Sequence, residues 1–433
     1  MKKVLFALII GLLFNSCTKK GDYEAVFSDP DQYSKTVELL TKIITHDIFN
    51  PPVASRIYSY SNIAAYEVIA SQSKNYKPLS SKLDGLKVQA ANKPVNKEFS
   101  AVLAFMYVGK ELTFSKDSTQ KIIDNFVQLA KDHAMPDDMI RNSEDYAHSV
   151  SKAVLDWAKT DNYKQTRSAV KYTVNTDESR WVPTPPAYMP AIEPNWMKIR
   201  TVLIDSASQF LPKPHSKFSK DKSSDFYKLA NEVYETGVKL SDEQKAIADF
   251  WDCNGFKVNV SGHVMFATKA MTPGGHWMGI TGIVCSAQKA DFDKTVYSYT
   301  GVSIAVMDAF IACWNTKFTY NLVRPETYIN LYIDNSWKPY LQTPPFPEYT
   351  SGHSIISSAS ATVLTRIFGE STPFVDSTER PWGWPDRKFE NVKQAAHEAA
   401  LSRLYGGIHY REAMEEGLIE GEKIGELVFS KLN

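Results

Sequence analysis

Apolar residues recur along most of the chain at intervals of three and four positions, whereas strictly alternating apolar and polar positions are scarce. Intervals of three and four place side chains on one face of an α-helix, while alternation would favour β-strands. The pattern therefore predicts an all-α protein. The segments expected to be helical are 33–49, 52–72, 97–111, 117–133, 136–160, 223–239, 241–251, 287–323, 353–369, 390–405 and 411–430.

Glycine and proline gather between these segments, where they mark turns and connections. Their main clusters are 181–194, 211–214, 273–275, 344–352 and 381–385. The simplest architecture is an N-terminal helical region, 31–210, followed by a C-terminal helical domain, 211–433. We expect the C-terminal domain to be a helical bundle, in which side chains of four facing helices around a polar centre would form the site.

The N-terminus resembles an export signal. Met1-Lys2-Lys3 precedes an apolar run, Val4–Phe14, that is too short to span a membrane stably, and Ser16-Cys17 follows. We expect a signal peptide over 1–16 and a lipid-anchored tether over 17–30 that begins at Cys17. The protein would then be a periplasmic or outer-membrane lipoprotein of a bacterium; the alternative is a plain signal peptide cleaved nearby.

Composition narrows the class of partner. The chain has 433 residues, of which 43% are hydrophobic and 23% charged, and its 49 basic residues balance 49 acidic ones. Because the net charge is zero, the chain is not expected to attract nucleic acid through an overall positive electrostatic field. No second apolar run of about 18 residues is expected to span a membrane, so the membrane contact would be the lipid anchor alone. Nothing predicts the oligomeric state.

Three cysteines remain after Cys17, namely Cys253, Cys285 and Cys313. An odd number in an oxidising compartment permits at most one disulfide, and their spacing does not indicate zinc.

Lys317 and Arg324 continue a core-facing stripe of the helix expected over 287–323. Pro325 disfavours helical geometry at the residue before it, so this helix should end near Arg324. The members of the stripe are Val306, Phe310, Cys313, Lys317, Tyr320 and Arg324.

Ser351 and Gly352 form the entry to the next helix, with His353 on its inner face. The first backbone N–H groups of a helix lack internal partners and favour negative charge. This helix start therefore suits an anion.

Arg403 ends the inner stripe of a third helix, which Gly406-Gly407 should terminate, and His409 follows. A single inward cation is most simply explained as a snorkelling residue or a structural ion pair. Three inward cations from three helices indicate instead a shared anion, because a buried cation is costly without one.

These blocks resemble the signature of vanadium-dependent haloperoxidases and type 2 phosphatidic acid phosphatases. The order is Lys317, six residues, Arg324-Pro325; then Ser351-Gly352-His353; then Ser402-Arg403, five residues, His409. The intervals are 25 residues between Pro325 and Ser351 and 48 between His353 and Ser402. The stretches 181–186 and 272–277 also resemble bacterial haloperoxidase-like members. The resemblance implies two packed four-helix bundles that form one globule, with the site in the C-terminal bundle.

The resemblance implies roles for the matching residues. His353 would be the acid–base residue, His409 would bond vanadium or attack phosphorus, and Lys317 would polarise a bound oxygen. Arginine supplies a planar, permanently charged fork of donors, and histidine exchanges protons near neutral pH. The residues that would bind vanadate or phosphate are Lys317, Arg324, Ser351, Gly352 and Arg403.

Two reactions suit such a pocket. In one, vanadate is the cofactor and a halide is oxidised by hydrogen peroxide; in the other, a phosphate ester is hydrolysed through a phosphohistidine. Both develop charge on oxygens that the same cations stabilise. A third possibility is a surface lipoprotein that only binds an oxyanion, although binding alone requires neither histidine.

Residues around the signature bear on this choice. Trp314 and Phe346 lie where the resemblance implies a halide pocket, and favour the peroxidase; the alternative is that they are ordinary core residues. Cys313 favours a phosphatase or a weakly oxidising, iodide-type enzyme, because a strong oxidant would attack a thiol.

The chain departs from the family pattern at two further positions. Ala413 replaces the aspartate that often orients the last histidine, so Glu412 or another acceptor must orient His409. Thr350 replaces the usual proline, and threonine also suits a turn before a helix.

Three other features have weaker interpretations. Ser261-Gly262-His263 repeats the tripeptide without a preceding lysine and arginine block, so we interpret it as a turn. His276 is expected to be a loop histidine in a Gly-Gly turn. Asp252 and Asn254 have no assigned role.

Overall fold

The computed structural model describes residues 21–255, 257–261, 263–267 and 269–433. The expected signal peptide and Cys17 lie outside the described residues. The N-terminal helices are α1 (Tyr23–Ser28), α2 (Pro30–His46), α3 (Pro51–Ala70), α4 (Lys97–Leu112), α5 (Lys116–Asp132), α6 (Asp137–Ala158) and α7 (Tyr163–Arg167). The later helices are α8 (Asp225–Val238), α9 (Asp242–Phe250), α10 (Pro273–Ala287), α11 (Phe292–Tyr320), α12 (Pro325–Tyr332), α13 (Gly352–Phe368), α14 (Val392–Tyr405) and α15 (Arg411–Leu432).

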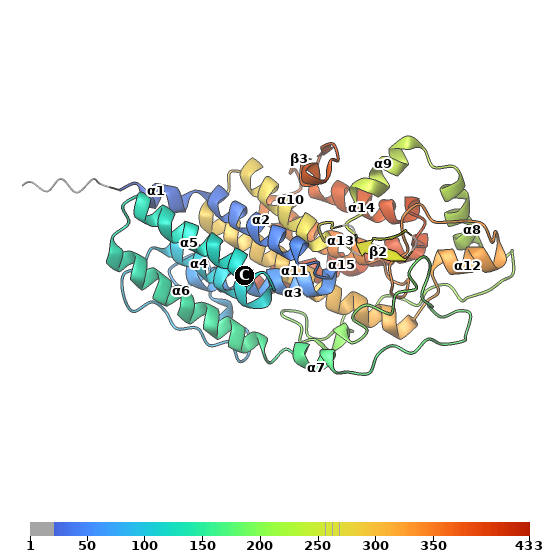
Figure 1. Ribbon diagram of the computed structural model, residues 1–433, viewed down its shortest axis with the longest axis horizontal. Helices are drawn as coiled ribbons and strands as arrows, with labels where there is room; N and C mark the ends of the chain where they lie inside the picture. The colour runs from blue at the N-terminus through green and yellow to red at the C-terminus, as the bar shows by residue number, and fades with distance from the viewer. Residues whose placement is uncertain (1–20, 256, 262, 268) are drawn as a thin grey trace, which may run out of the picture.

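The molecule is elongated, with the N-terminal helices α1 to α6 toward one end and α8, α9, α12 and α14 toward the other (Figure 1). The long helix α11 lies between them and packs against α3 on one side and α13 on the other. Within the C-terminal group, α13 packs against α14 and α15. One continuous hydrophobic cluster extends from Phe27 to Leu432, so the bundles share a core. The expected all-α class is confirmed.

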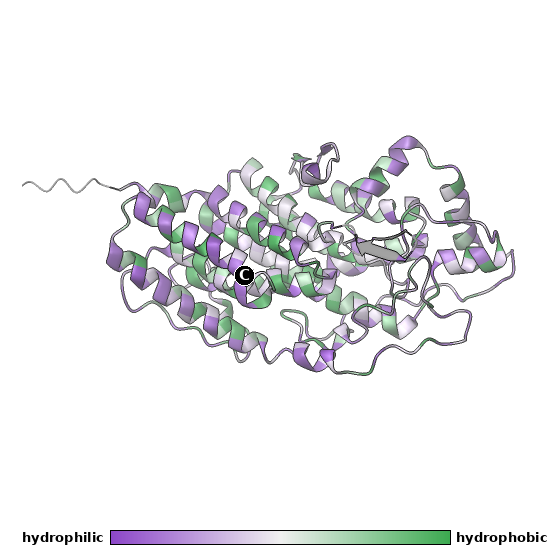
Figure 2. Cartoon of the chain, viewed as in Figure 1, coloured by the Kyte–Doolittle hydropathy of each residue, from purple (hydrophilic) through white to green (hydrophobic). Residues whose placement is uncertain are grey.

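The outer helices show why the pattern predicted them. Along α5 and α6 hydrophilic and hydrophobic residues alternate around the helix (Figure 2), and only one face is buried. Burying one apolar face stabilises a helix far more than its intrinsic propensity does. The predicted bounds of these helices differ from the observed ones by one or two residues.

Helix α11 corrects the expectation that no further apolar run could span a membrane. Its 29 residues include an 18-residue window of mean hydropathy 1.4, and that window is 100% buried inside the protein. A helix that is apolar on all sides suits a position in the middle of a large fold.

The helix predicted over 287–323 is shorter at both ends, because α11 spans Phe292–Tyr320 and Ala287 is the last residue of α10. Lys289 has a positive φ of 52°, and the Asp291 side chain accepts from the Lys294 N–H at 2.7 Å to begin α11. At the other end, Asn321 adopts the left-handed conformation (φ 52°), which asparagine tolerates, and closes the helix. The helix therefore ends four residues earlier than Arg324.

Helix α10 was not predicted, because Gly274 and Gly275 suggested a connection. Instead Thr272 caps the helix by accepting from the Gly275 N–H at 3.1 Å, and Pro273 occupies the first turn. A capping threonine followed by proline is a helix start. His276 is consequently a fully buried helical residue, and its interpretation as a loop histidine is wrong.

Three short helices, α1, α7 and α12, were also missed. Helix α12 begins at Pro325, and α1 occupies part of the segment 17–30 that was expected to be a tether. All three helices have fewer than nine residues, which is too short for a clear periodic pattern.

The strands are confined to two hairpins among the described residues. β1 (Val258–Ser261) pairs antiparallel with β2 (Val264–Ala267), and β3 (Phe374–Asp376) pairs antiparallel with β4 (Arg387–Phe389). His263 lies in the turn between β1 and β2, as expected, whereas Gly262 lies outside the described residues. Cys253, Cys285 and Cys313 are buried and free.

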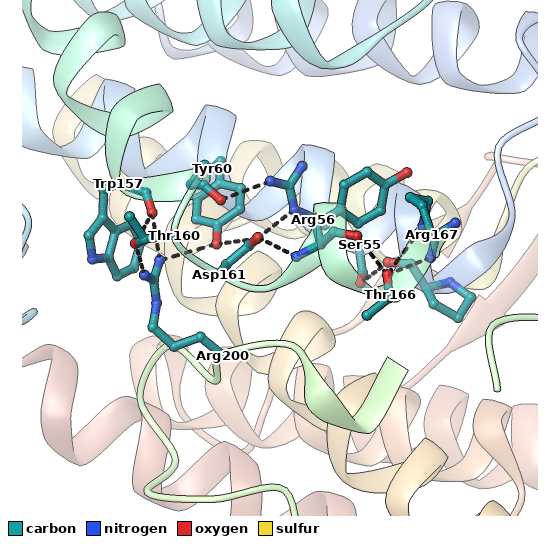
Figure 3. A network of polar contacts seen from close by, with 12 residues as sticks. Ser55, Arg56, Tyr60, Trp157, Thr160, Asp161, Thr166, Arg167 and Arg200 are labelled. Atoms are coloured by element: carbon teal, nitrogen blue, oxygen red, sulfur yellow. Dashed lines mark hydrogen bonds and ion pairs between the residues drawn. The ribbon is translucent and has the colours of Figure 1, made fainter. Parts of the chain in front are cut away.

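A buried polar network ties α3 to the end of α6 (Figure 3). Arg56 Nε donates to Asp161 Oδ2 at 2.6 Å, and the Tyr60 hydroxyl donates to the same oxygen at 2.8 Å. Arg200 donates to the Thr160 hydroxyl at 2.6 Å and to the Trp157 carbonyl at 3.1 Å. The buried charges are therefore compensated, and the segment after α7 is held against the bundle.

A second buried carboxylate holds that segment against α11. Asp308 accepts hydrogen bonds from the backbone N–H groups of Val202, Leu203 and Ile204 at 2.7, 2.8 and 3.0 Å. Burial raises the pKa of Asp308 to about 6 in spite of these bonds. The connection between the two halves of the chain thus runs in a fixed path along the central helix.

Helices α13 and α15 approach each other closely because α15 carries Gly417, Gly421 and Gly425 at intervals of four. A Cβ at Gly421 would lie 2.2 Å from the Ile355 carbonyl oxygen, and one at Gly425 would lie 2.7 Å from the Ala359 carbonyl oxygen. These neighbours are backbone atoms and cannot rotate away. The glycines therefore set the position of α13, whose first residues belong to the candidate site.

Candidate active site

Lys317 lies in the last turn of α11 and is completely buried. Its ammonium donates to the carbonyl oxygens of Pro347, Glu348 and Thr350 at 2.9, 3.0 and 2.5 Å. Burial lowers the pKa of Lys317 to about 8, and the nearby Arg324 contributes in the same direction. Three carbonyl groups thus fix the position of the ammonium, and its lowered pKa lets it lose a proton more easily than an exposed lysine does.

Arg324 is the residue that precedes α12, so it reaches the site from a helix start and not from the end of the α11 stripe. Nε donates to the Phe346 carbonyl at 2.9 Å, and Nη1 donates to the Ile408 carbonyl at 2.7 Å. Nη2 is buried and has no hydrogen-bond partner among the residues that the structure describes. A buried guanidinium N–H without an acceptor is costly, which indicates an anion.

Arg403 lies in the last turn of α14 and is buried, as predicted. Its Nε donates to the Ser402 hydroxyl at 2.8 Å, and Nη2 donates to the Trp251 carbonyl at 2.7 Å. Asp252, for which the sequence suggested no role, acts on Arg403 electrostatically. No carboxylate is recorded within salt-bridge distance of Lys317, Arg324 or Arg403 among the described residues.

The start of α13 has the predicted form. The Ser351 hydroxyl caps the helix by accepting from the Ser354 N–H at 3.3 Å, and the Ser351 N–H donates to the Ala413 carbonyl at 3.0 Å. A Cβ at Gly352 would meet no heavy atom within 4 Å, so there is open space beside the first residue of the helix. A ligand there would face a helix N-terminus.

His353 is the second residue of α13. Its Nε2 is buried and has no partner in the described part of the chain, while the other ring nitrogen bonds the Trp251 carbonyl. Desolvation, followed by the positive charge of Arg403, holds the pKa of His353 well below its usual value. An unpartnered imidazole nitrogen beside a buried arginine again indicates a ligand that shares protons with it.

His409 is oriented by Glu348. His409 Nδ1 lies 2.7 Å from Glu348 Oε1, which also accepts from the Tyr410 N–H at 3.0 Å. Glu412 instead accepts from the Ser216 N–H at 2.9 Å, so it is not the orienting group. The acceptor needed in place of an aspartate at position 413 comes from the loop before α13.

The charges around His409 decide its protonation. Burial and the cations Arg324, Lys317 and Arg403 hold the pKa of His409 well below its usual value, and burial raises the pKa of Glu348 to about 7. The tautomer that fits these contacts has Nδ1–H donating to Glu348, which leaves a lone pair on Nε2. Nε2 lies 3.2 Å from Arg324 Nη1, so the lone pair faces the cationic side of the site.

The two aromatic residues lie together beside the cations. The ring centroids of Trp314 and Phe346 are 5.1 Å apart, and Trp314 donates its indole N–H to the Ile192 carbonyl at 3.1 Å. Lys317 Nζ and Arg324 Cζ each lie 5.0 Å from the centre of the Phe346 ring. Phe346 therefore meets both cations with its negative face and keeps water from them.

A thiol and a carboxyl group complete the surroundings of Lys317. Cys313 lies one turn before it, with Sγ 3.7 Å from the Thr350 carbonyl, and burial raises the pKa of Cys313 to about 12. Glu420 accepts from the Thr350 hydroxyl at 3.1 Å, and burial raises its pKa to about 8. Both groups are favoured in their neutral forms at neutral pH, so neither cancels the positive charge of the site.

The arrangement fits a tetrahedral oxyanion. Three buried cations, the start of α13 and two neutral imidazoles converge, and both Arg324 Nη2 and His353 Nε2 lack partners. The sequence located the cations, the helix start and both histidines. It missed Glu348, although this is the only acidic residue between Asp334 and Glu370 and lies in the proline-rich stretch before Ser351.

Comparisons with known proteins also point to an enzyme that binds an oxyanion. The family model described as the VCPO second helical-bundle domain matches residues 297–336 and 330–433. The structure is similar to that of the first bacterial vanadium-dependent iodoperoxidase, with a TM-score of 0.88 and 45% sequence identity, over 93% of this chain and 97% of that one.

More distant structures share the fold. The holo-type bacterial vanadium-dependent chloroperoxidase matches with a TM-score of 0.66 and 15% identity, over 89% of this chain and 93% of that one. The apo-type structure matches with a TM-score of 0.63 and 16% identity, over 88% and 94% of the two chains. A search among curated proteins gives no match.

Proposed function

The chain belongs to the vanadium-dependent haloperoxidase family, and on that premise we propose that it oxidises iodide with hydrogen peroxide, using vanadate as its cofactor. The observation that supports the proposal most is a pair of buried polar atoms without a partner among the described residues, the donor Arg324 Nη2 and the imidazole nitrogen His353 Nε2, beside the lone pair of His409 Nε2. A tetrahedral anion of high negative charge would satisfy these groups together.

The residues that would hold vanadate are Lys317, Arg324, Ser351, Gly352 and Arg403, with His409 Nε2 as the ligand of vanadium. Arg324 and Arg403 supply donors that stay charged, and the start of α13 supplies the dipole. Glu348 keeps His409 in the tautomer whose Nε2 carries a lone pair. Vanadate, when bound, would act as a Lewis acid that activates hydrogen peroxide for attack by a halide.

The overall reaction is H₂O₂ + I⁻ + H⁺ → HOI + H₂O, so one proton must be delivered. His353 is placed to hold and deliver it, because its Nε2 faces the site and its other nitrogen is fixed by the Trp251 carbonyl. Lys317 would polarise a bound oxygen. Phe346 covers both Lys317 and Arg324 and would exclude water from them.

Iodide is proposed as the halide for two reasons. The similar structure at 45% identity is of an iodoperoxidase. In addition, Cys313 lies one turn from Lys317 as a buried thiol with a raised pKa, and a thiol tolerates a weakly oxidising product better than a strongly oxidising one. Trp314 and Phe346 are the residues that we propose for the halide pocket.

Turnover of purified protein tests the proposal. Protein treated to remove bound anions should produce triiodide from iodide and peroxide only after orthovanadate is added, and less product from bromide at equal concentration. His409→Ala should abolish the vanadate-dependent rate. Halide oxidation that needs no vanadate, or that persists in His409→Ala, would reject it.

Phosphate-ester hydrolysis is the second candidate, and one observation favours it. The missing aspartate at position 413 counted against a phosphohistidine, but Glu348 supplies an acceptor that orients His409 as a nucleophile. Release of phosphate from p-nitrophenyl phosphate without vanadate, inhibited by vanadate, would support this reaction. Tight binding of the anion with neither turnover would instead support an oxyanion-binding protein.

We also propose that the protein is exported and anchored through a lipid at Cys17. The support is the basic and apolar N-terminal sequence that ends at Ser16-Cys17.

A further inference from the structure

Cys253, His276 and Glu379 form a second group of metal-ligand side chains outside the oxyanion site. Their ligand atoms lie within 4.8 Å of one another, and the three residues are 3%, 0% and 7% exposed. They come from the segment after α9, the first turn of α10 and the segment after β3. The fold has therefore brought them together over more than 100 positions of sequence.

The separations between the three atoms match those of a tetrahedral site. Cys253 Sγ lies 3.4 Å from His276 Nδ1, His276 Nδ1 lies 3.3 Å from Glu379 Oε1, and Cys253 Sγ lies 3.9 Å from Glu379 Oε1. Zinc bonds of about 2.0 Å to nitrogen or oxygen and about 2.3 Å to sulfur place tetrahedral ligand atoms roughly 3.3–3.6 Å apart. The triangle would need only small movements of Glu379 to close on one ion.

The histidine is already held as a metal ligand. His276 Nε2 lies 2.8 Å from Asp376 Oδ2, and Asp376 Oδ1 accepts from the Thr378 N–H and hydroxyl at 3.0 and 2.6 Å. The ring also stacks on Trp251, with centroids 4.5 Å apart. Without a metal, and in spite of burial, the charge of Asp376 raises the pKa of His276 well above its usual value. When Nδ1 loses its proton to a metal, Asp376 holds Nε2–H, so the remaining tautomer carries its lone pair on Nδ1 and that nitrogen is a stronger ligand.

In this tautomer, a lone pair of nitrogen and a carboxylate oxygen face each other at 3.3 Å in a buried place. Such a contact is repulsive unless a cation lies between the two atoms, and the cation can be a proton on Nδ1 or a metal ion. Without a metal, a protonated Nδ1 and the Cys253 thiol can each donate to Glu379 Oε1. A single metal ion would replace both protons and satisfy all three groups at once.

We propose that Cys253, His276 and Glu379 bind one zinc ion through Sγ, Nδ1 and Oε1. The donor set of sulfur, nitrogen and carboxylate oxygen suits Zn²⁺, and three protein ligands leave a fourth position for water. Binding would release two protons to solvent, the thiol proton of Cys253 as the Zn–S bond forms and the Nδ1 proton of His276 as the Zn–N bond forms, without any change in oxidation state.

The ion would stiffen one side of the oxyanion site. Trp251, two residues before Cys253, accepts from Arg403 Nη2 at 2.7 Å and also bonds the His353 ring through its carbonyl. A zinc ion would join the Trp251 segment to α10 and to the segment after β3, and so fix the carbonyl that positions Arg403 and His353. Zinc is thus a positioning element, separate from the proposed vanadate.

Metal analysis of the full-length protein tests the proposal without any turnover assay. We expect about one zinc per chain after purification without added metal. After chelator treatment, Co²⁺ should restore one site per chain, with the intense near-ultraviolet absorption of a thiolate bound to cobalt. Zn²⁺ should displace Co²⁺ and raise the unfolding temperature.

Variants assign the ligands. Cys253→Ser should remove the thiolate absorption and weaken Zn²⁺ binding by more than about 100-fold, and Asp376→Asn, which leaves all three ligands in place, should weaken it by about 10- to 100-fold. Cys285→Ser, at another buried free cysteine, is the matched control and should bind as the wild type does. If Cys253→Ser fails to fold, Glu379→Gln provides the same test with a side chain of similar size.

Two results would overturn the proposal. The first is a folded protein that binds neither Zn²⁺ nor Co²⁺, which would mean that a doubly protonated His276 donates one N–H to Asp376 and the other to Glu379. The second is Co²⁺ binding that is unchanged in Cys253→Ser or Glu379→Gln. Neither result depends on whether the protein oxidises iodide.

Discussion

His409 Nδ1 and Glu348 Oε1 are 2.7 Å apart, and both side chains are buried. The two residues are 61 positions apart in sequence, yet this contact decides which nitrogen of His409 can reach an anion. Because Nδ1–H is held by the carboxylate, the lone pair of Nε2 is directed to the side of Arg324. The contact therefore keeps His409 in the tautomer whose Nε2 lone pair can bind a metal or attack phosphorus.

Removing this carboxylate should weaken oxyanion binding. In Glu348→Gln the amide can either accept from or donate to His409 Nδ1, so the favourable tautomer loses its advantage. We expect orthovanadate to bind about 10- to 100-fold more weakly, measured by equilibrium dialysis.

Glu412→Gln is the matched control, because Glu412 is the glutamate three residues after His409 and contacts the Ser216 N–H instead. It should bind vanadate as the wild type does. Equal affinities of Glu348→Gln and the wild type would show that Glu348 does not prepare His409.

Anion binding should weaken with rising pH because of Lys317. Burial depresses its pKa to about 8, so without an anion the amine becomes neutral above that pH, whereas an anion binds the charged form. Binding is then coupled to proton uptake, and the affinity should fall by up to about tenfold for each pH unit above 8.

Sulfate is the suitable probe for this effect, because its own charge does not change in this range. Calorimetric titration between pH 8 and 10 should show the decline in the wild type, while Lys317→Met should bind weakly at every pH. A sulfate affinity that stays constant over this range in the wild type would contradict the assignment of a depressed pKa to Lys317.

Gly421→Ala should destabilise the protein and displace the start of α13. The added Cβ would lie 2.2 Å from the Ile355 carbonyl oxygen, so α13 and α15 must separate. Such overpacking costs about 1–3 kcal/mol, measured by denaturant unfolding. Glu422→Ala, at the next, exposed position of α15, should change the free energy of unfolding by less than about 0.5 kcal/mol.

An unfolding free energy of Gly421→Ala equal to that of the wild type would mean that α13 and α15 do not approach as closely as described. A loss of vanadate affinity in Gly421→Ala that exceeds the loss in Glu422→Ala would link this packing to the site.

The sequence predicted most of this site because its elements are local. Lys317, Ser351 and Arg403 lie on long helices whose stripes and ends can be read from neighbouring residues, and each is buried as expected. Arg324 is buried too, but it is placed by the start of α12 and not, as the sequence had predicted, by the end of α11. Asn321 in the left-handed conformation ends α11, and Pro325 begins a new helix, so the two cations are not on one stripe.

What the sequence did not show depends on contacts between distant segments. Glu348 reaches His409 only because the loop before α13 folds back beside the end of α14, and no local pattern records that path. Likewise, Cys253, His276 and Glu379 meet only in the folded chain, and the misinterpretation of α10 as a connection placed His276 in a loop. The spacing of residues along a sequence therefore does not predict a metal site whose ligands come from three separate segments.

The proposed lipid anchor has a direct test. Cys17→Ala should move the protein from the membrane fraction to the soluble fraction of the exported proteins, because a thiol is required for lipid attachment. Cys285→Ser should leave the distribution unchanged. Unaltered membrane association of Cys17→Ala would reject the anchor.

A crystal structure of the protein grown with orthovanadate tests the central claim most directly. We expect a bond from vanadium to His409 Nε2, with Glu348 on the other ring nitrogen and with Arg324 Nη2 and His353 Nε2 within hydrogen-bond distance of the anion. Vanadate bound elsewhere, or bound without contact to His409, would contradict it.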